Sequence, residues 1–432
     1  MTQPLATIHL ELNEPPEGFV RAEDIRKSLS AVIQVGRHLW LGCDETATLE
    51  RLTYRGGGRW GDHRSFRLAD VLDLPGGPDD EVDVEGLAWD PPYLWVAGSH
   101  SRKRAQPEPG DDVETVADQL ADVDTEQNRY LVARIPLEED PEHGGLTPRR
   151  SCPDPRDPSA TLTAARLKGK GPDSMLVRAL RKDPHLKKFL RLPGKDNGFD
   201  VEGLSAAGGR LFLGLRGPVL RGWAVVLELL PEDTGKPGRL KLARTGPDGR
   251  RYRKHFLALD GLGVRELTHV GDDMLVLAGP TMDVHAPATV FRWTNAVSAE
   301  GDSVAAGPTL PRLMALPHDV EGPGDHPEGM CRFRGPGLDG EGLLVVYDSP
   351  ARRRQHRGGL RADVFPIPRT EGLLSRILGG GHGDADDGPP TDGGRNAGDG
   401  DAGGGAEGQG DGDDGGTRGQ AWNQPNREEG QG

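Results

Sequence analysis

Apolar residues along this chain recur in short blocks that have the spacing of β-hairpins. In four units a first apolar block is followed seven positions later by a second one, and these units start at Val32, Leu87, Leu204 and Leu267. Two short strands joined by a tight turn form a hairpin, and a second strand that lacks alternation is of the kind buried on both faces. A fifth unit starts at Met330 and reaches its second strand, residues 343–347, after a longer Gly-rich turn. The pattern predicts an all-β repeat protein.

The units are spaced like the blades of a β-propeller. Their starts lie 55, 117, 63 and 63 residues apart, and the tetrapeptide Asp-Val-Glu-Gly occurs at residues 83–86, 200–203 and 319–322. Spacings somewhat above the usual blade length fit blades with long loops, and the largest gap indicates an insertion at residues 100–199. We therefore expect about five blades, or six if part of the insertion folds as one.

The N-terminal segment is expected to close the ring. Further strand-like runs follow the hairpin in most units, but the last unit offers only residues 361–366. Residues 6–12 alternate apolar and polar side chains before the first unit begins. Pairing the first and last segments would remove the open edges of the ring.

The insertion and the C-terminal tail differ from the repeats. Residues 173–181 and 184–191 carry apolar side chains at helical spacing and several lysines and arginines, which predicts two short basic helices. Such a pair docks an acidic partner, or it is simply a solvated face. Residues 381–432 contain no Leu, Ile, Val, Met, Phe or Tyr, and they hold 12 acidic residues against 3 arginines. We expect residues 1–378 to form one domain and residues 379–432 to be a disordered acidic tail.

Charge and composition say more about the cellular location of the protein than about its function. The tail carries −9 (3 minus 12) of the chain's net charge of −15, so the rest is only mildly acidic and gives no nucleic-acid signature. No basic segment with an apolar core opens the chain, no apolar run approaches 18 residues, and three cysteines have no paired spacing. These observations predict a cytoplasmic monomer with no membrane association.

Candidate chemistry lies where the units begin. Aligning them places Ser30, Glu85, Glu202, Arg265 and Glu328 at equivalent positions on the innermost strands, which converge on the axis of a ring. Carboxylates that face one another repel unless a cation separates them. Arg265 is one such cation, and calcium is the other, because hard oxygen ligands suit it. The expected calcium ligands are Glu85, Glu202, Glu328, Asp83 and Asp200. The alternative is structural: the glutamates accept backbone N–H groups of the neighbouring blade.

A second candidate set carries positive charge just after the second strands. It consists of Arg216, Arg221, His100 and Arg102, to which Lys195 is added. Arginines near Gly-Pro turns clamp an anionic ligand, or they form salt bridges between adjacent loops. Both interpretations stay open.

Two longer motifs resemble a known family. The run Lys-Asp-Asn-Gly-Phe-Asp-Val-Glu-Gly-Leu at residues 195–204 and the segment at residues 214–224 resemble the bacterial family called domain of unknown function 3616. The similarity extends from about residue 28 to residue 366, and it implies a propeller-like β-fold without an established activity. A more distant similarity to phytase-like and lactonase-like propellers implies axial glutamates that bind calcium. Ser30 and Arg265 depart from that pattern.

Two hypotheses on function follow. The first is a binding scaffold for a protein or an anionic ligand. The second is a metal-assisted hydrolase of phosphate esters or of carboxylic and lactone esters. In it Glu85, Glu202 and Glu328 are ligands or acid/base groups, and Arg265 stabilises the anion.

Overall fold

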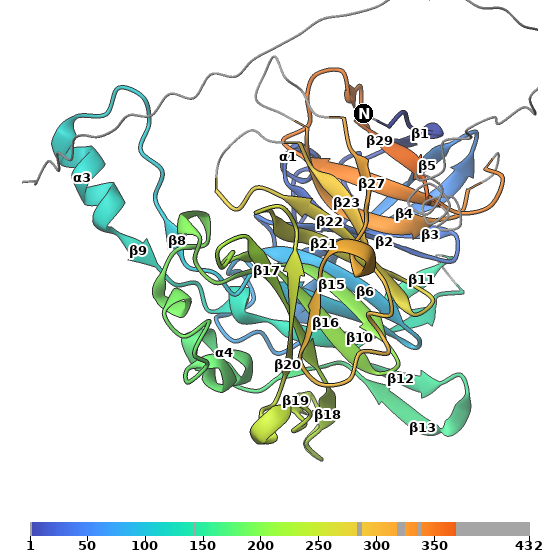
Figure 1. Ribbon diagram of the computed structural model, residues 1–432. Coiled ribbons are helices and arrows are strands. Elements are labelled where there is room, and N and C mark those ends of the chain that lie inside the picture. The colour runs from blue at the N-terminus through green and yellow to red at the C-terminus, as the bar shows by residue number, and fades with distance from the viewer. Residues whose placement is uncertain (1, 142–143, 283–286, 318–324, 336–337, 369–432) are drawn as a thin grey trace, which may run out of the picture. The chain divides into compact units, whose positions relative to one another are not determined.

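The computed structural model describes residues 2–141, 144–282, 287–317, 325–335 and 338–368, and Figure 1 shows their arrangement. The predicted tail and the third tetrapeptide, residues 319–322, lie outside the described residues. Strands dominate and helices are few and short, so the fold is all-β as predicted. No helix in the described ranges is long and apolar enough to cross a membrane.

Five antiparallel hairpins form at the five predicted units. Each joins an apolar first strand to a second strand that is buried along most of its length. The hairpins are β2 (Leu29–Val35) with β3 (His38–Cys43), β6 (Val84–Asp90) with β7 (Tyr93–Gly98), β15 (Asp200–Ala207) with β16 (Arg210–Gly217), β21 (Gly263–Val270) with β22 (Asp273–Gly279), and β26 (His326–Phe333) with β27 (Gly342–Asp348).

The first strands of these hairpins contact one another in a closed cycle. β2 contacts β6, β6 contacts β15, β15 contacts β21, β21 contacts β26, and β26 contacts β2. The glycine of the repeated Glu-Gly pair makes this approach possible. A Cβ atom at Gly203 would lie 3.1 Å from the backbone of Glu266, and one at Gly329 would lie 3.0 Å from the backbone nitrogen of Val32. Glycine is therefore required where the backbones approach this closely, at Gly203 and Gly329, whereas the first and fourth units have Ala31 and Glu266 at the equivalent position.

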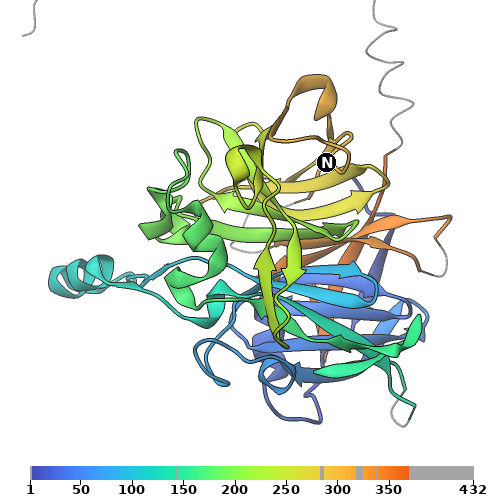
Figure 2. The same ribbon diagram turned by 90° about the horizontal axis from the view of Figure 1, so that it is seen from below.

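Each gap between consecutive hairpins is filled by its own apolar core. Trp40 and Leu94 belong to the core between the first and second hairpins, and Phe212 and Val276 to the core between the third and fourth. The other three cores lie between the remaining neighbours around the cycle. Figure 2, which turns the view by 90°, shows the strands in separate layers, with yellow strands in its upper part and blue strands in its lower part. Burial between sheets, rather than within one, therefore stabilises the fold.

Outer strands complete the sheets. They are β4 (Thr48–Gly56), β5 (Arg59–Arg67), β10 (Val132–Glu139), β11 (Leu146–Pro148), β14 (Ala165–Leu167), β17 (Trp223–Leu229), β18 (Pro231–Asp233), β19 (Arg239–Leu242), β20 (Arg253–Ala258), β23 (Thr289–Trp293), β24 (Ser303–Ala305), β25 (Arg312–Ala315), β28 (Gln355–His356) and β29 (Gly359–Pro366). Two short helices, α1 (Ala22–Lys27) and α2 (Leu68–Val71), lie in connections.

The N-terminal strand joins the two ends of the chain's repeats. β1 (Ala6–Leu10) pairs antiparallel with β29 and parallel with β5, so the first and last hairpins share one sheet. Pairing of the N-terminal segment with the last unit is what the sequence predicts. It satisfies the backbone groups of two strands that would otherwise form open edges.

The insertion is partly helical, but only one of its two predicted helices is present. α4 (Met175–Leu180) buries its apolar face, and Ser174 caps its N-terminus. The prediction of a second helix at residues 184–191 is wrong, because these residues form turns that end in the 3-10 helix η3 (Phe189–Arg191). The Asp183 carboxylate accepts the backbone N–H groups of His185 and Leu186, and it is itself held by Tyr252 and Lys254. These bonds have the geometry of a helix N-cap, and the N–H of Lys187 also donates to the backbone oxygen of Asp183 at 3.2 Å, so the chain makes a single turn here before η3 and not the longer helix that was predicted.

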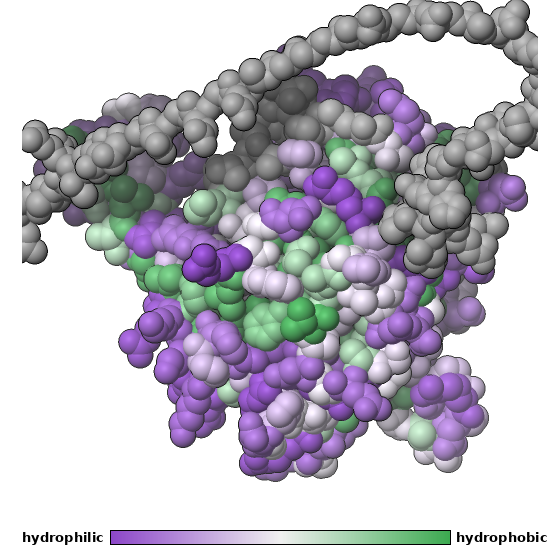
Figure 3. Space-filling model, viewed as in Figure 1, coloured by the Kyte–Doolittle hydropathy of each residue, from purple (hydrophilic) through white to green (hydrophobic). Residues whose placement is uncertain are grey.

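The rest of the insertion extends away from the sheets or adds to them. α3 (Val113–Ala121) has no buried residue and connects β8 (Lys103–Arg104) to β9 (Val123–Asp124), while β12 (Ser151–Asp154) and β13 (Asp157–Thr163) form a separate hairpin (Figure 1). Lysines 182, 187 and 188 are exposed, as a solvated face requires. On the face in Figure 3, apolar residues gather across the middle and hydrophilic residues surround them.

Candidate functional site

The charged residues predicted at the unit starts lie close together in space. The Nη1 atom of Arg265 is 2.6 Å from Oε1 of Glu328 and 3.1 Å from Oε2 of Glu202, so one guanidinium links two carboxylates from different inner strands. Arg265 also donates to the backbone oxygen of Pro280 at 3.2 Å. Ser30, the remaining uncharged member, donates its hydroxyl to the backbone oxygen of Val84 and ties β2 to β6.

Arg216, predicted as part of a separate anion clamp, belongs to this same cluster. Its Nη1 atom lies 2.8 Å from Oε1 of Glu202, and its Nη2 atom lies 2.7 Å from Oδ2 of Asp200. The side chain of Arg216 is 13% exposed, and those of Glu202 and Asp200 are 4% exposed. Charge-assisted bonds of this kind hold the guanidinium in place. Arg216 is therefore committed to two carboxylates of its own chain.

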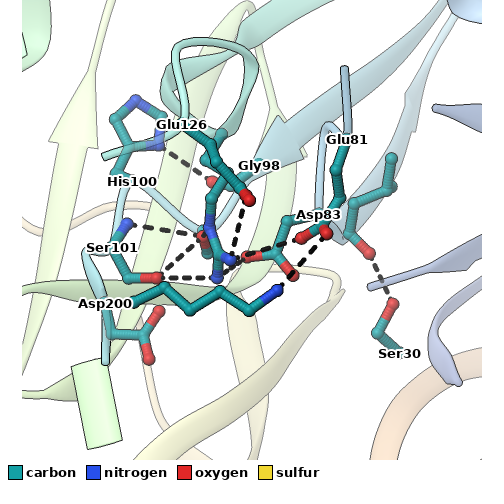
Figure 4. A network of polar contacts seen from close by, with 12 residues as sticks. Ser30, Glu81, Asp83, Gly98, His100, Ser101, Glu126 and Asp200 are labelled. Atoms are coloured by element: carbon teal, nitrogen blue, oxygen red, sulfur yellow. Dashed lines mark hydrogen bonds and ion pairs between the residues drawn. The ribbon is translucent and has the colours of Figure 1, made fainter. Parts of the chain in front are cut away.

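Asp83 has its own arginine, which reaches it from the connection after the second hairpin. Arg129 forms an ion pair with Asp83 and lies 3.2 Å from Glu81, and it donates to the hydroxyls of Ser99 and Ser101 at 3.0 and 2.9 Å. Figure 4 shows this network, with Asp200 at its edge and Ser30 beyond Asp83. The site thus extends from one inner strand to the next.

Two carboxyl groups of the site have no predicted counterpart. Asp44 follows β3 directly, and Asp348 ends β27. Burial raises the pKa of Asp44, and the negative charges of Asp83, Asp348 and Glu328 raise it further. An antiparallel hairpin brings the end of its second strand beside the start of its first. Polar residues at the ends of second strands were therefore the signal that would have revealed both.

Carboxyl groups outnumber cations in this cluster. Arg129, Arg216 and Arg265 are its buried or nearly buried cations. The carboxyl groups are Asp44, Asp83, Glu85, Asp200, Glu202, Glu328 and Asp348. If all were ionised, the seven carboxylates and three guanidinium groups would give a net charge of −4 (3 minus 7). Such an excess is costly in a partly buried place.

The pKa values reflect this excess. Burial raises the pKa of Glu202 to about 7 in spite of the opposing charges of Arg216 and Arg265. Burial also raises the pKa of Glu328 to about 7, against the effect of Arg265. The pKa of Glu85 is raised well above its usual range, first by burial and then by Asp83, Glu202 and Glu328. Glu85 has no ion pair or hydrogen bond of its side chain among the contacts of the described residues.

The structural role predicted for the repeat glutamates is performed by a different residue. Glu266 stands where three of the other units have the glycine of Glu-Gly, and its Oε1 atom accepts the backbone N–H groups of Leu204 at 3.0 Å and Leu267 at 2.8 Å. It thereby ties β21 to β15. In the described contacts, Glu202 and Glu328 bond to guanidinium groups instead of backbone N–H groups. Sequence reasoning missed Glu266, although its place at a glycine position was visible in the alignment of units.

The other residues predicted to bind an anion do not form one clamp. His100 is buried, with its Nδ1 atom 2.8 Å from the backbone oxygen of Gly98, and burial lowers its pKa to about 4. Arg221 is exposed in a left-handed turn, and Arg102 contributes its backbone oxygen to the N–H of Gly194. Lys195 is exposed in η4 (Gly194–Asp196), where its charge acts on Glu328 and Asp348.

A calcium ion does not fit this set as the side chains lie. Oxygen ligands of the right type are plentiful, but Arg265 occupies the space between Glu202 and Glu328, and Arg216 that between Glu202 and Asp200. Within the part of the chain that the structure describes, no group of three or more His, Cys, Asp or Glu side chains is spaced for a metal. Calcium takes six to eight oxygen ligands. The predicted calcium site stays a prediction.

Comparison with known proteins gives the family. A family model described as a protein of unknown function (DUF3616) matches residues 28–363. The chain belongs to this family. A search of the curated proteins finds no match.

Similar solved structures for this DUF3616 protein include two enzymes. The glutaminyl cyclase of Myxococcus xanthus shares 11% identity at a TM-score of 0.36, over 84% of this chain and 94% of the other. The PQQ-bound aldose sugar dehydrogenase of Streptomyces coelicolor shares 13% identity at a TM-score of 0.33, over 84% of this chain and 98% of the other. Likeness at this level carries no argument about activity.

Proposed function

We propose that this protein is a five-bladed β-propeller that binds a small cationic ligand at the acidic end of its axis. Five hairpins, five cores between consecutive hairpins and a closed cycle of inner-strand contacts support the blade count. The strand β1 that joins the sheets of the first and last hairpins supports closure by the N-terminus. The function follows from the charges at the axis.

The observation that carries the proposal is the excess of carboxyl groups over cations around Glu85. Arg216 and Arg265 are already paired with Asp200, Glu202 and Glu328, so they leave no free guanidinium for an anion. Glu85 has a raised pKa and no paired partner among the described residues. A cationic ligand would supply the positively charged partner that Glu85 lacks. This favours a cationic ligand over the anionic ligand predicted from the sequence.

A primary ammonium group fits better than a metal ion. It donates three N–H bonds and needs no shell of six to eight oxygens, so it can use Glu85 and its neighbours while the arginines keep their places. Glu328, at 15% of its side chain, and Arg265, at 10%, keep a small exposed fraction, so the cluster is not completely sealed from solvent.

Calorimetric titration of the full chain with 1,4-diaminobutane tests the proposal, with calcium chloride as a separate titration. We expect the diamine to bind one to one and to release protons, because a cation favours ionised carboxylates whose pKa values lie at about 7. Glu85→Gln should weaken binding at least tenfold, while the control Glu232→Gln, at an exposed pair with Lys241, should not. Binding of calcium alone would support the metal site instead. Equal binding by wild type and Glu85→Gln would reject a cation site at the axis.

A hydrolase is the second candidate, and one observation favours it. Glu202 and Glu328 have pKa values of about 7, where a side chain is effective both as an acid and as a base. Glu328 would move the proton, and Arg265, 2.6 Å away, would stabilise developing negative charge. Hydrolysis of p-nitrophenyl phosphate, p-nitrophenyl acetate and γ-butyrolactone should then be lost in Glu328→Gln. If no substrate is hydrolysed, or if hydrolysis is unchanged in Glu328→Gln, the hydrolase hypothesis is rejected and the binding function is the one that remains.

A further inference from the structure

A pocket of about 460 Å³ lies where the inner strands end, away from the carboxyl cluster at their starts. All five inner strands contribute to it, each with residues from its second half. The lining includes Leu87, Leu204, Leu267, Met330, Ile33 and Trp89. A volume of this size is typical of sites for small molecules.

The apolar lining is accompanied by a few polar groups. Ser205, Thr268 and His269 contribute from β15 and β21. The Thr268 hydroxyl donates to the backbone oxygen of Met330 at 2.8 Å. Burial lowers the pKa of His269, and the charge of Arg332 lowers it further, which favours the neutral form of this imidazole. These groups give hydrogen bonds without adding charge.

The charged rim of the pocket has an excess of one positive charge. Among the described residues that line the pocket, Glu341 is the one acid, and it is shared by two arginines. Its Oε2 atom lies 2.6 Å from Nη2 of Arg332, and its Oε1 atom lies 2.6 Å from Nε of Arg334. Two guanidinium groups and one carboxylate sum to +1 (2 minus 1). The side chains of Arg332 and Arg334 are 37% and 76% exposed, and Arg332 bonds to Glu341 through Nε and Nη2 while Arg334 uses Nε, so each guanidinium keeps N–H donors that Glu341 does not take.

We propose that this pocket binds a small carboxylic acid with an apolar body. The apolar body lies along Leu87, Leu204 and Met330, and the carboxylate takes the unbalanced positive charge of Arg332 and Arg334. Guanidinium groups bind carboxylates in a two-pronged geometry that a neutral head group cannot reproduce. This site is separate from the cation site at the strand starts, differs from it in the charge of its ligand, and does not depend on it.

Calorimetric titration of the full chain with decanoate, below its micelle concentration, is the test. Decanol and decylamine are matched ligands with the same apolar body, and butyrate is the matched acid without one. We expect decanoate to bind one to one and at least tenfold more tightly than the other three. Arg332→Gln should weaken decanoate binding at least tenfold. The control Arg312→Gln, at an exposed arginine 3.6 Å from Asp260, should leave it unchanged.

Each other outcome overturns the proposal. No binding of decanoate means that the pocket holds only water. Equal affinity for decanoate, decanol and decylamine would mean that Arg332 and Arg334 do not recognise the carboxylate. Should Arg332→Gln lose its circular dichroism spectrum, Arg334→Gln at the more exposed arginine carries the same test. Titration with 1,4-diaminobutane in the same variants separates the two sites, because its binding should not respond to either substitution.

Discussion

Replacing Arg265 by methionine should destabilise the protein in a way that depends on pH. The substitution keeps an apolar stem but removes the charge that links Glu202 and Glu328. Both carboxyl groups already have pKa values of about 7, and in both the charge of Arg265 opposes a further rise. Without it, both pKa values should move above 7.

Proton linkage gives the direction in which the free energy of unfolding changes with pH. In wild type the folded chain keeps protons on Glu202 and Glu328 that the unfolded chain releases above about pH 4.5, so the free energy of unfolding falls as pH rises from 4.5 to 7. In Arg265→Met the folded chain keeps these protons beyond pH 7. The free energy of unfolding of the variant therefore continues to fall above pH 7, where that of wild type becomes constant. A rise of one pKa unit in each group corresponds to about 3 kcal/mol in total. This agrees with the roughly 3–5 kcal/mol that breaking one half of a buried ion pair costs.

Urea denaturation at pH 6 and pH 9 measures the effect. At pH 6 we expect the free energy of unfolding of Arg265→Met to be about 1 kcal/mol below that of wild type, because packing and the hydrogen bond to Pro280 are lost. At pH 9 we expect about 3 kcal/mol more. The double variant Arg265→Met/Glu328→Gln should recover part of the loss at pH 9, since one of the two facing charges is gone. A difference that is the same at both pH values would refute the electrostatic role assigned to Arg265.

Three further outcomes are expected. Glu266→Gln keeps an oxygen for the N–H of Leu204 and should be tolerated, whereas Glu266→Leu strands that group and should lower the free energy of unfolding by about 1–3 kcal/mol in urea titrations. Gly203→Ala places a Cβ atom 3.1 Å from the backbone of Glu266 and should cost about 1–3 kcal/mol, seen as a lower melting temperature; an unchanged value would mean that the inner strands separate easily. Lys254→Met leaves the buried Asp183 carboxylate without its cation, 2.7 Å away in wild type, and limited trypsin digestion should then cut residues 184–192 faster.

The hairpins and their order could be predicted because they depend on local patterns. A seven-residue step between apolar blocks fixes a hairpin, and the glycine after the repeated glutamate marks the place where inner strands touch. The pairing of β1 with β29 was predictable from a missing strand in the last unit and an alternating segment before the first. The failed helix at residues 184–191 shows the limit of this reasoning. Its apolar spacing was helical, but Asp183 bonds to Tyr252 and Lys254, which are distant in sequence.

The site was less predictable, because its partners come from strand ends and connections. Alignment of the units identified Glu85, Glu202, Arg265 and Glu328, all of which lie on inner strands. It gave no reason to pair Asp83 with Arg129, which lies within the insertion, after α3 and β9. Sequence reasoning left Arg216 open between an anionic ligand and a salt bridge, and it did not point to Glu202, 2.8 Å away, as the partner. Which cation meets which carboxylate depends on three-dimensional packing that one sequence pattern does not contain.

The two units that depart from the repeat explain why the remaining glutamates can coexist. Around the cycle of inner strands the order is Ser30, Glu85, Glu202, Arg265 and Glu328. Arg265 separates Glu202 from Glu328, and the neutral Ser30 separates Glu328 from Glu85. Five identical glutamates would have placed five like charges side by side and required several ions. With these two replacements, and with Arg216 on Glu202, Glu85 is the inner-strand glutamate that has no guanidinium partner among the described residues. Asp44 and Asp348 add two further carboxyl groups with raised pKa values to this cluster, so a small cation bound there would be surrounded by several acids, and Glu85 is the one whose substitution tests the proposal most directly.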